Sequence, residues 1–85
     1  MKYTFNPKTK ISFSILEERH AEISIYNIKG QKIKQLISDQ LSAGEHSVVW
    51  DGRDEKNQPV GSGIYFYRLL IDGKSKASRK MILMK

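Results

Sequence analysis

The chain has 85 residues, which is enough for one small domain and too few for a second hydrophobic core. Hydrophobic residues make up 39% and charged residues 28%, a balance typical of a globular domain, and no apolar run approaches the length of a membrane span. The absence of cysteine excludes disulfides and thiolate chemistry, and the net charge of +6 comes from basic residues spread over every third of the chain, so no concentrated nucleic-acid patch is expected.

The first half of the chain opens with two predicted strands. We expect one domain over residues 1–85, with an ordered core from about residue 6, and residues 1–7 lack the apolar segment of an export signal. Alternation of apolar and polar residues, typical of strands with one buried face, predicts strands near 9–16 and 20–28. The polar segment between these two strands has the length of a hairpin loop.

The segment after the second strand allows two interpretations. A turn at 27–31 contains Gly30, which supplies a positive φ at low cost, and a third strand is predicted near 31–38. The apolar residues of 31–41 also fit a helical period. The strand is favoured because strands flank the segment and no capping residue opens a helix.

Two further strands carry much of the expected core. One presents His46, Val48 and Trp50 on a single face, and Trp50 is expected to be core because a ring of this size supplies much of a small domain's apolar area. The apolar run 64–71 predicts a largely buried strand. We therefore expect a core built from four strands, with these members: Ile11, Phe13, Ile23, Ile25, Val48, Trp50, Ile64 and Phe66.

The C-terminal segment predicts a hairpin. Asp72-Gly73 signals a two-residue turn that returns the chain as a strand over 76–85, with Ala77, Met81 and Leu83 on one side. Its basic residues fit a charged edge strand and a recognition element equally well. Six or seven short strands with no confident helix predict an all-β sandwich or small barrel.

Catalytic and metal-binding groups are poorly represented. His20 and His46 are the only histidines, and no evident acid–base partner stands near either in the sequence. Asp51, Asp54 and Asn57 lack the alternate spacing and closing glutamate of a calcium loop, so these Asp side chains are expected to bond loop amides instead. No base is placed beside the candidate serine nucleophiles, which are Ser12, Ser14, Ser47 and Ser62. We expect no enzyme activity, no cofactor and no metal.

Six segments, in order and at matching spacing, carry a resemblance to a known family: 6–11, 25–31, 43–52, 59–60, 62–68 and 80–85. Together they resemble the type A C-terminal sorting domain of the type IX (Por) secretion system and the similar immunoglobulin-like domain of flagellar hook-capping proteins. The resemblance implies an immunoglobulin-like antiparallel β-sandwich of about seven strands.

The sorting resemblance also implies a function and partners. It implies a non-catalytic module that directs an N-terminal cargo domain through an outer-membrane translocon, with a sortase-like peptidase acting in many members. The chain would then be exported, passing through the periplasm to the cell surface or medium. By this resemblance the translocon-recognition residues are Gly63, Tyr65, Lys80, Met81 and Lys85.

Two other functions remain open. A structural domain, as in a flagellar hook cap, would make protein–protein contacts without a translocon, and it could lie inside its parent protein, whereas a sorting domain requires Lys85 to be the natural C-terminus. A carbohydrate- or nucleic-acid-binding sandwich is weaker, because the aromatic residues fall in strands that are expected to be buried. Nucleic acid is not an expected partner.

Overall fold

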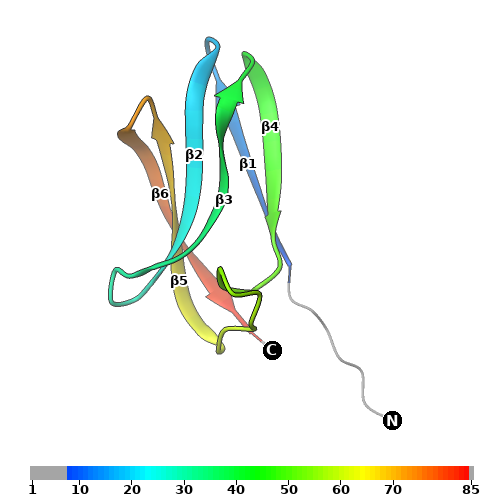
Figure 1. The fold of residues 1–85 in the computed structure, drawn as a ribbon, viewed down its shortest axis with the longest axis vertical. Helices are drawn as coiled ribbons and strands as arrows, with labels where there is room; N and C mark the ends of the chain where they lie inside the picture. The colour runs from blue at the N-terminus through cyan, green and yellow to red at the C-terminus, as the bar shows by residue number, and fades with distance from the viewer. Residues whose placement is uncertain (1–7, 85) are drawn as a thin grey trace.

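The computed structural model describes residues 8–84, which form two packed layers of antiparallel strands (Figure 1). In chain order the strands are β1 (Thr9–Ile15), β2 (Arg19–Asn27), β3 (Lys32–Leu41), β4 (Gly44–Trp50), β5 (Gly63–Ile71) and β6 (Lys74–Leu83). The expected all-β immunoglobulin-like sandwich is confirmed, with six strands in the described part of the chain. Within that part, no helix could span a membrane.

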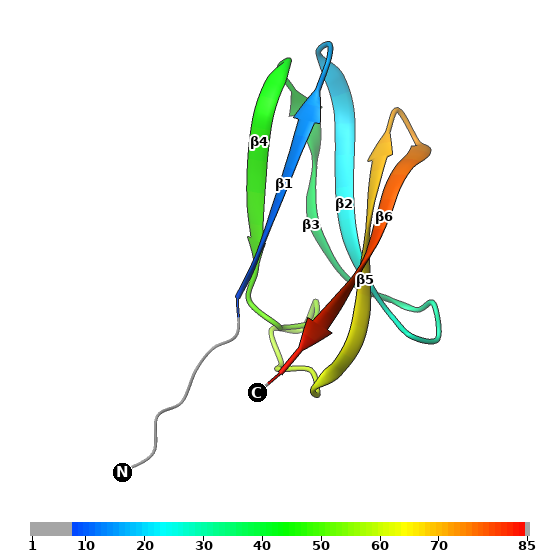
Figure 2. The ribbon, with the colours of Figure 1, turned by 180° about the vertical axis from the view of Figure 1, so that it is seen from behind.

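The two layers differ in width. One holds only β1 and β4, and the other has four strands in the order β3-β2-β5-β6 (Figures 1 and 2). The prediction of a hairpin between the first two strands is wrong, because β1 pairs with β4, from Thr9 opposite Trp50 to Ile15 opposite Gly44. The short polar connection instead carries the chain from one layer to the other, which its length permits equally well.

The third element is a strand, as favoured, and bulges explain its helix-like apolar spacing. Ile37 lies opposite Ile23, but Gln35 lies opposite the next residue of β2, which leaves Leu36 as an extra residue. A second shift nearby leaves Ile33 unpaired in the same way. Each bulge interrupts the period of two, so the apolar residues of β3 no longer alternate strictly.

The predicted two-residue turn is confirmed. Ile71 is the register partner of Lys74, so only Asp72 and Gly73 lie between β5 and β6, with φ angles of 50° and 80°. Two successive positive φ angles are the requirement of the type I′ turn, whose twist matches that of the strands. The turn returns β6 along β5 and makes it an edge strand of the wide sheet.

The core lies between the two layers, with Trp50 at 1% exposure. The other buried apolar residues are Ile11, Ile15, Ala21, Ile23, Ile25, Tyr65, Leu69, Met81 and Leu83. Phe13 and Val48 are partly buried and pack against this cluster. The placement of Ile64 and Phe66 in the core is wrong. Because successive residues of a strand point to opposite faces, Tyr65 and Leu69 take the core face of β5, and Ile64 and Phe66 point to the outer face.

Candidate functional site

An exposed apolar cluster lies on the outer face of the wide sheet. Tyr26 and Phe66 are register partners across β2 and β5, and Ile64 and Ile82 are partners across β5 and β6. The exposed fractions of Ile28, Ile64 and Ile82 are 68%, 37% and 65%. We call this cluster, formed by Tyr26, Ile28, Ile64, Phe66 and Ile82, the outer-face patch.

A hollow of about 250 Å³ opens within the outer-face patch. Tyr26, Ile28 and Phe66 form its apolar walls, and Arg68 and Ser78 lie at its edge. The guanidinium carbon of Arg68 lies 5.6 Å from the centroid of the Tyr26 ring, a cation–π arrangement. The hollow therefore joins aromatic surface to a positioned positive charge.

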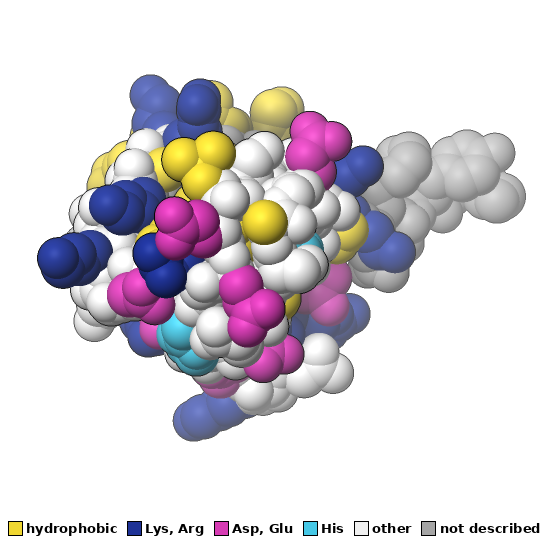
Figure 3. All heavy atoms as spheres, turned by 90° about the horizontal axis from the view of Figure 1, so that it is seen from above, with side chains coloured by type: hydrophobic (Ala, Val, Ile, Leu, Met, Phe, Trp, Pro, Cys, Tyr) yellow, Lys and Arg dark blue, Asp and Glu magenta, His cyan; other side chains and the backbone are white. Residues whose placement is uncertain are grey.

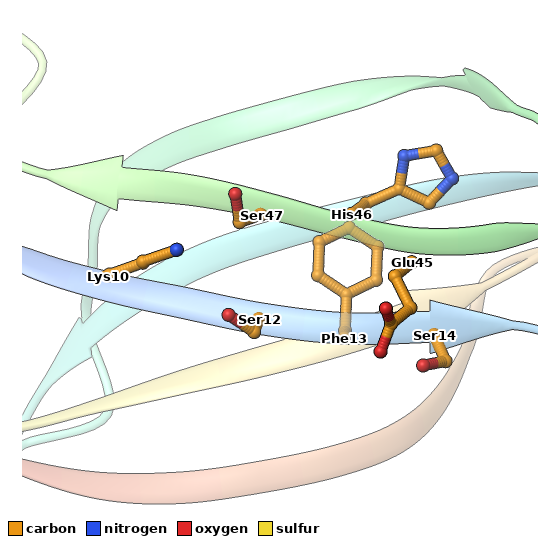
Figure 4. Close-up of a pocket in the computed structure, with 7 residues that line it drawn as sticks. All are labelled: Lys10, Ser12, Phe13, Ser14, Glu45, His46 and Ser47. Carbon is orange, nitrogen blue, oxygen red and sulfur yellow. The ribbon is translucent and has the colours of Figure 1, made fainter.

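A polar furrow of about 350 Å³ crosses the outer face of β1 and β4 (Figure 4). Its lining includes the hydroxyls of Ser12, Ser14 and Ser47, but the neighbouring His46 is bonded through Nε2 to the Ser42 carbonyl at 2.7 Å. The His46 ring also stacks on Phe13, with 5.6 Å between centroids. The Glu45 carboxylate also lines the furrow opposite Ser14, but among residues 8–84 no hydrogen bond joins a base to the three serine hydroxyls, so the furrow shows no activated nucleophile.

One histidine does meet a hydroxyl. Nε2 of His20 on β2 lies 3.0 Å from Oγ of Ser38 on β3, and both residues are exposed. Among residues 8–84 no carboxylate is bonded to the other ring nitrogen of His20, so the pair lacks the third group that orients a catalytic histidine. We interpret it as a surface cross-strand contact.

The polar loop after β4 is organised by its own side chains. Oδ1 of Asp51 accepts a bond from the Arg53 amide at 3.1 Å, and Oδ1 of Asp54 accepts from the amides of Lys56 and Gln58 at 2.9 and 3.0 Å. The expected bonding of Asp side chains to loop amides is confirmed. No cluster of three or more possible metal ligands occurs in the described part of the chain.

The described residues assigned by the sorting resemblance lie on the paired strands β5 and β6, where Tyr65 is opposite Met81, but they face different sides of the sheet. Tyr65 is 8% exposed, its hydroxyl donates to the Gly61 carbonyl at 2.7 Å, and its ring meets Trp50 edge-on with centroids 5.3 Å apart. Met81 is 9% exposed in the same core, and Gly63 begins β5. Tyr65 and Met81 therefore expose little surface, and the role of Gly63, Tyr65 and Met81 in translocon recognition stays a prediction.

The remaining two assigned residues differ from the core positions. Lys80 is exposed beside the outer-face patch, as the register partner of Phe66. Lys85 lies outside the described residues. Their role in translocon recognition stays a prediction.

Sequence reasoning missed most of the outer-face patch, although a signal for it was present. Met81 and Leu83 were expected on one side of the last strand, and the same period of two places Lys80 and Ile82 on the other side. Arg68 and Tyr26 were missed because their contact joins different strands and depends on register.

The charged residues elsewhere form no single-sign patch at the end of the sandwich that carries the β1–β2, β3–β4 and β5–β6 connections. Lys and Arg side chains alternate there with Asp and Glu (Figure 3). Arg19, for example, pairs with both Glu17 and Asp72. Positive and negative side chains are therefore mixed at this end of the sandwich.

Comparisons with known proteins identify the family. The model of the FlgD Ig-like domain matches residues 2–74. The crystal structure of FlgD from P. aeruginosa superposes with a TM-score of 0.67 at 26% identity, covering 92% of this chain and 62% of that one, so this chain spans less than two thirds of its structural relative. A comparison with curated proteins finds no match. The family model and the fold agree, and the chain belongs to the FlgD Ig-like domain family.

Proposed function

We propose that this chain is a structural immunoglobulin-like domain that makes protein–protein contacts within an assembly, as the corresponding domain of a flagellar hook cap does. The observation that carries the proposal is the outer-face patch, an aromatic and aliphatic cluster that no described part of the chain covers. The family match supports the structural class.

The outer-face patch differs from the rest of the described surface because its apolar side chains are clustered. Single exposed apolar residues are common and need no explanation, whereas a contiguous cluster marks a contact surface. The large hydrophobic residues that are exposed in the described chain are Leu16, Ile28, Val49, Ile64, Ile82 and Met84. Three of these belong to the patch, and Met84 follows Ile82 by two residues, while Leu16 lies in the β1–β2 connection and Val49 on β4.

The strand composition points the same way. The apolar run of β5 is typical of a strand that is buried on both faces, but this fold covers only the face with Tyr65 and Leu69. A partner that packs on Ile64 and Phe66 would bury the second face of β5, as the apolar sequence of this strand predicts. Burial of such residues supplies about 25 cal/mol per Å² of apolar area.

The sorting function has less support. The comparisons support the hook-capping side of the resemblance and give no support to a type IX sorting domain. Sorting, the translocon, the peptidase, the cargo domain and the exported location therefore stay predictions. The exposed basic residues of the edge strand β6 are the feature through which a translocon would act.

The test is made in the full-length parent protein in its host. The double variant Ile64→Ser and Ile82→Ser removes the exposed aliphatic groups, and the matched control carries Leu16→Ser and Val49→Ser, which are exposed elsewhere. Both should fold, because exposed substitutions usually change stability by about 0.5 kcal/mol or less. Fractionation and immunoblotting then measure how much parent protein enters the assembly.

The proposal predicts that the patch variant is lost from the assembly and that the control enters it normally. Assembly of the patch variant at the level of the unmodified protein would refute the proposal. Export of a reporter fused ahead of this chain, in a host with a type IX system, would instead support the sorting prediction.

A further inference from the structure

Arg68 is held in place at the edge of the outer-face patch. It is a half-buried residue on the outer face of β5, in register between Ser24 of β2 and Ser78 of β6. Its guanidinium lies over the Tyr26 ring, and Tyr26 pairs with Phe66 one row closer to the patch. The side chain is therefore directed toward the apolar surface, with its guanidinium held beside an aromatic ring.

The donors of Arg68 have no carboxylate partner within residues 8–84. The ion pairs there join Arg19 to Glu17 and Asp72, and Lys32 to Glu22. Glu22 precedes Ser24 on β2, but its Oε2 already accepts a bond from the Ser24 hydroxyl at 3.0 Å and from Lys32 at 3.3 Å.

A second unpaired cation stands on the other side of Phe66. Lys80 is the register partner of Phe66 and is exposed, with no ion pair in the described region. Phe66 thus lies between Lys80 on β6 and the cation–π pair of Arg68 and Tyr26. The outer-face patch therefore has an apolar centre, and the two cations at its edge, Arg68 and Lys80, have no ion-pair partner among residues 8–84.

We infer that this hollow binds a carboxylate of the partner protein, an aspartate or glutamate side chain set among apolar residues, with Arg68 as its bidentate donor. The inference rests on the proposed contact function and names the chemistry of the partner surface. A planar guanidinium matches a carboxylate through two parallel bonds, and the apolar walls formed by Tyr26, Ile28 and Phe66 reduce the contact of that pair with water.

A second copy of the chain does not fit this role. Face-to-face pairing would bring together two surfaces that each carry Arg68 and Lys80, and each chain has a net charge of +6. An acidic partner surface gains from the same charges, both in orientation and in association rate.

The test is an NMR titration of the ¹⁵N-labelled 85-residue chain with two blocked peptides, one of alternating isoleucine and aspartate and one with asparagine in place of aspartate. The aspartate peptide should shift the amides of Tyr26, Phe66 and Arg68. Arg68→Gln should weaken its binding by about tenfold or more, the usual value of a charge-assisted pair. The control Lys10→Gln makes the same change of charge on β1 and should alter binding by less than about twofold.

Each other outcome overturns the inference. Equal binding of the two peptides at the patch would show an apolar contact without carboxylate recognition, which would leave the proposed contact function standing. Equal losses in Arg68→Gln and Lys10→Gln would show attraction to overall charge alone. No shifts at the patch at up to about 5 mM of the aspartate peptide would show that the hollow does not bind carboxylates. The assembly test with the Ile64 and Ile82 variant is independent of all three results.

Discussion

Two substitutions of Tyr65 measure separately how much its hydroxyl and its ring contribute to the free energy of unfolding. Its ring is buried against Trp50, and its hydroxyl bonds the Gly61 carbonyl at 2.7 Å. Tyr65→Phe removes only that bond, and because Gly61 is exposed its carbonyl can bond water instead, so we expect a loss of about 1 kcal/mol. Tyr65→Ala also removes the ring from the core, and we expect a loss of about 3–5 kcal/mol.

The two losses differ in the share of the total free energy of unfolding that they remove. An 85-residue domain is expected to have a free energy of unfolding of roughly 4–13 kcal/mol, so Tyr65→Ala removes a large share and Tyr65→Phe a small one. Urea unfolding followed by the fluorescence of Trp50, the one tryptophan, and by circular dichroism measures both values. The reasoning fails if Tyr65→Ala is as stable as the unmodified chain, or if Tyr65→Phe loses as much as Tyr65→Ala.

Three further predictions use the same unfolding measurement. Gly73→Ala should lower the stability by about 1–2 kcal/mol because Gly73 has a φ of 80°. The control Gly61→Ala, at a site with open space and no positive φ, should change the stability by less than about 0.5 kcal/mol. Equal effects of the two substitutions would contradict the role given to the positive φ of Gly73. Asp54→Ala should cost about 1–2 kcal/mol by leaving two loop amides without their acceptor, and an unchanged urea midpoint would exclude that role. Arg19→Ala should lower the stability by less than about 1 kcal/mol, since its ion pairs are exposed. A larger loss would show that these ion pairs stabilise the fold more than exposed pairs usually do.

The sequence predicted the strands well because their signals are local. Alternation located β1 and β2 to within about a residue at each end, and Asp72-Gly73 identified its turn through backbone requirements that few other pairs meet. Pairing is not local. A short polar connection can close a hairpin or cross between layers, and the partner of β1 is β4, a strand far from it in the sequence.

The candidate site was harder to predict for a related reason. An unbroken apolar run does not show which of its faces is covered, so Ile64 and Phe66 were expected in the core with their neighbours. Only the register with β6, which pairs Ile64 with Ile82, shows that the two belong to one exposed surface. The contact of Arg68 with Tyr26 likewise requires three-dimensional information.

The most direct test of the contact function is hydroxyl-radical footprinting of the chain alone and of its full-length parent in the assembly. If the outer-face patch is the contact surface, labelling of Tyr26 and Phe66 falls on assembly, while labelling of the exposed Leu16 and Val49 stays the same. Labelling of Tyr26 and Phe66 that is equally strong in both states would contradict the proposal that this sheet face is covered by a partner.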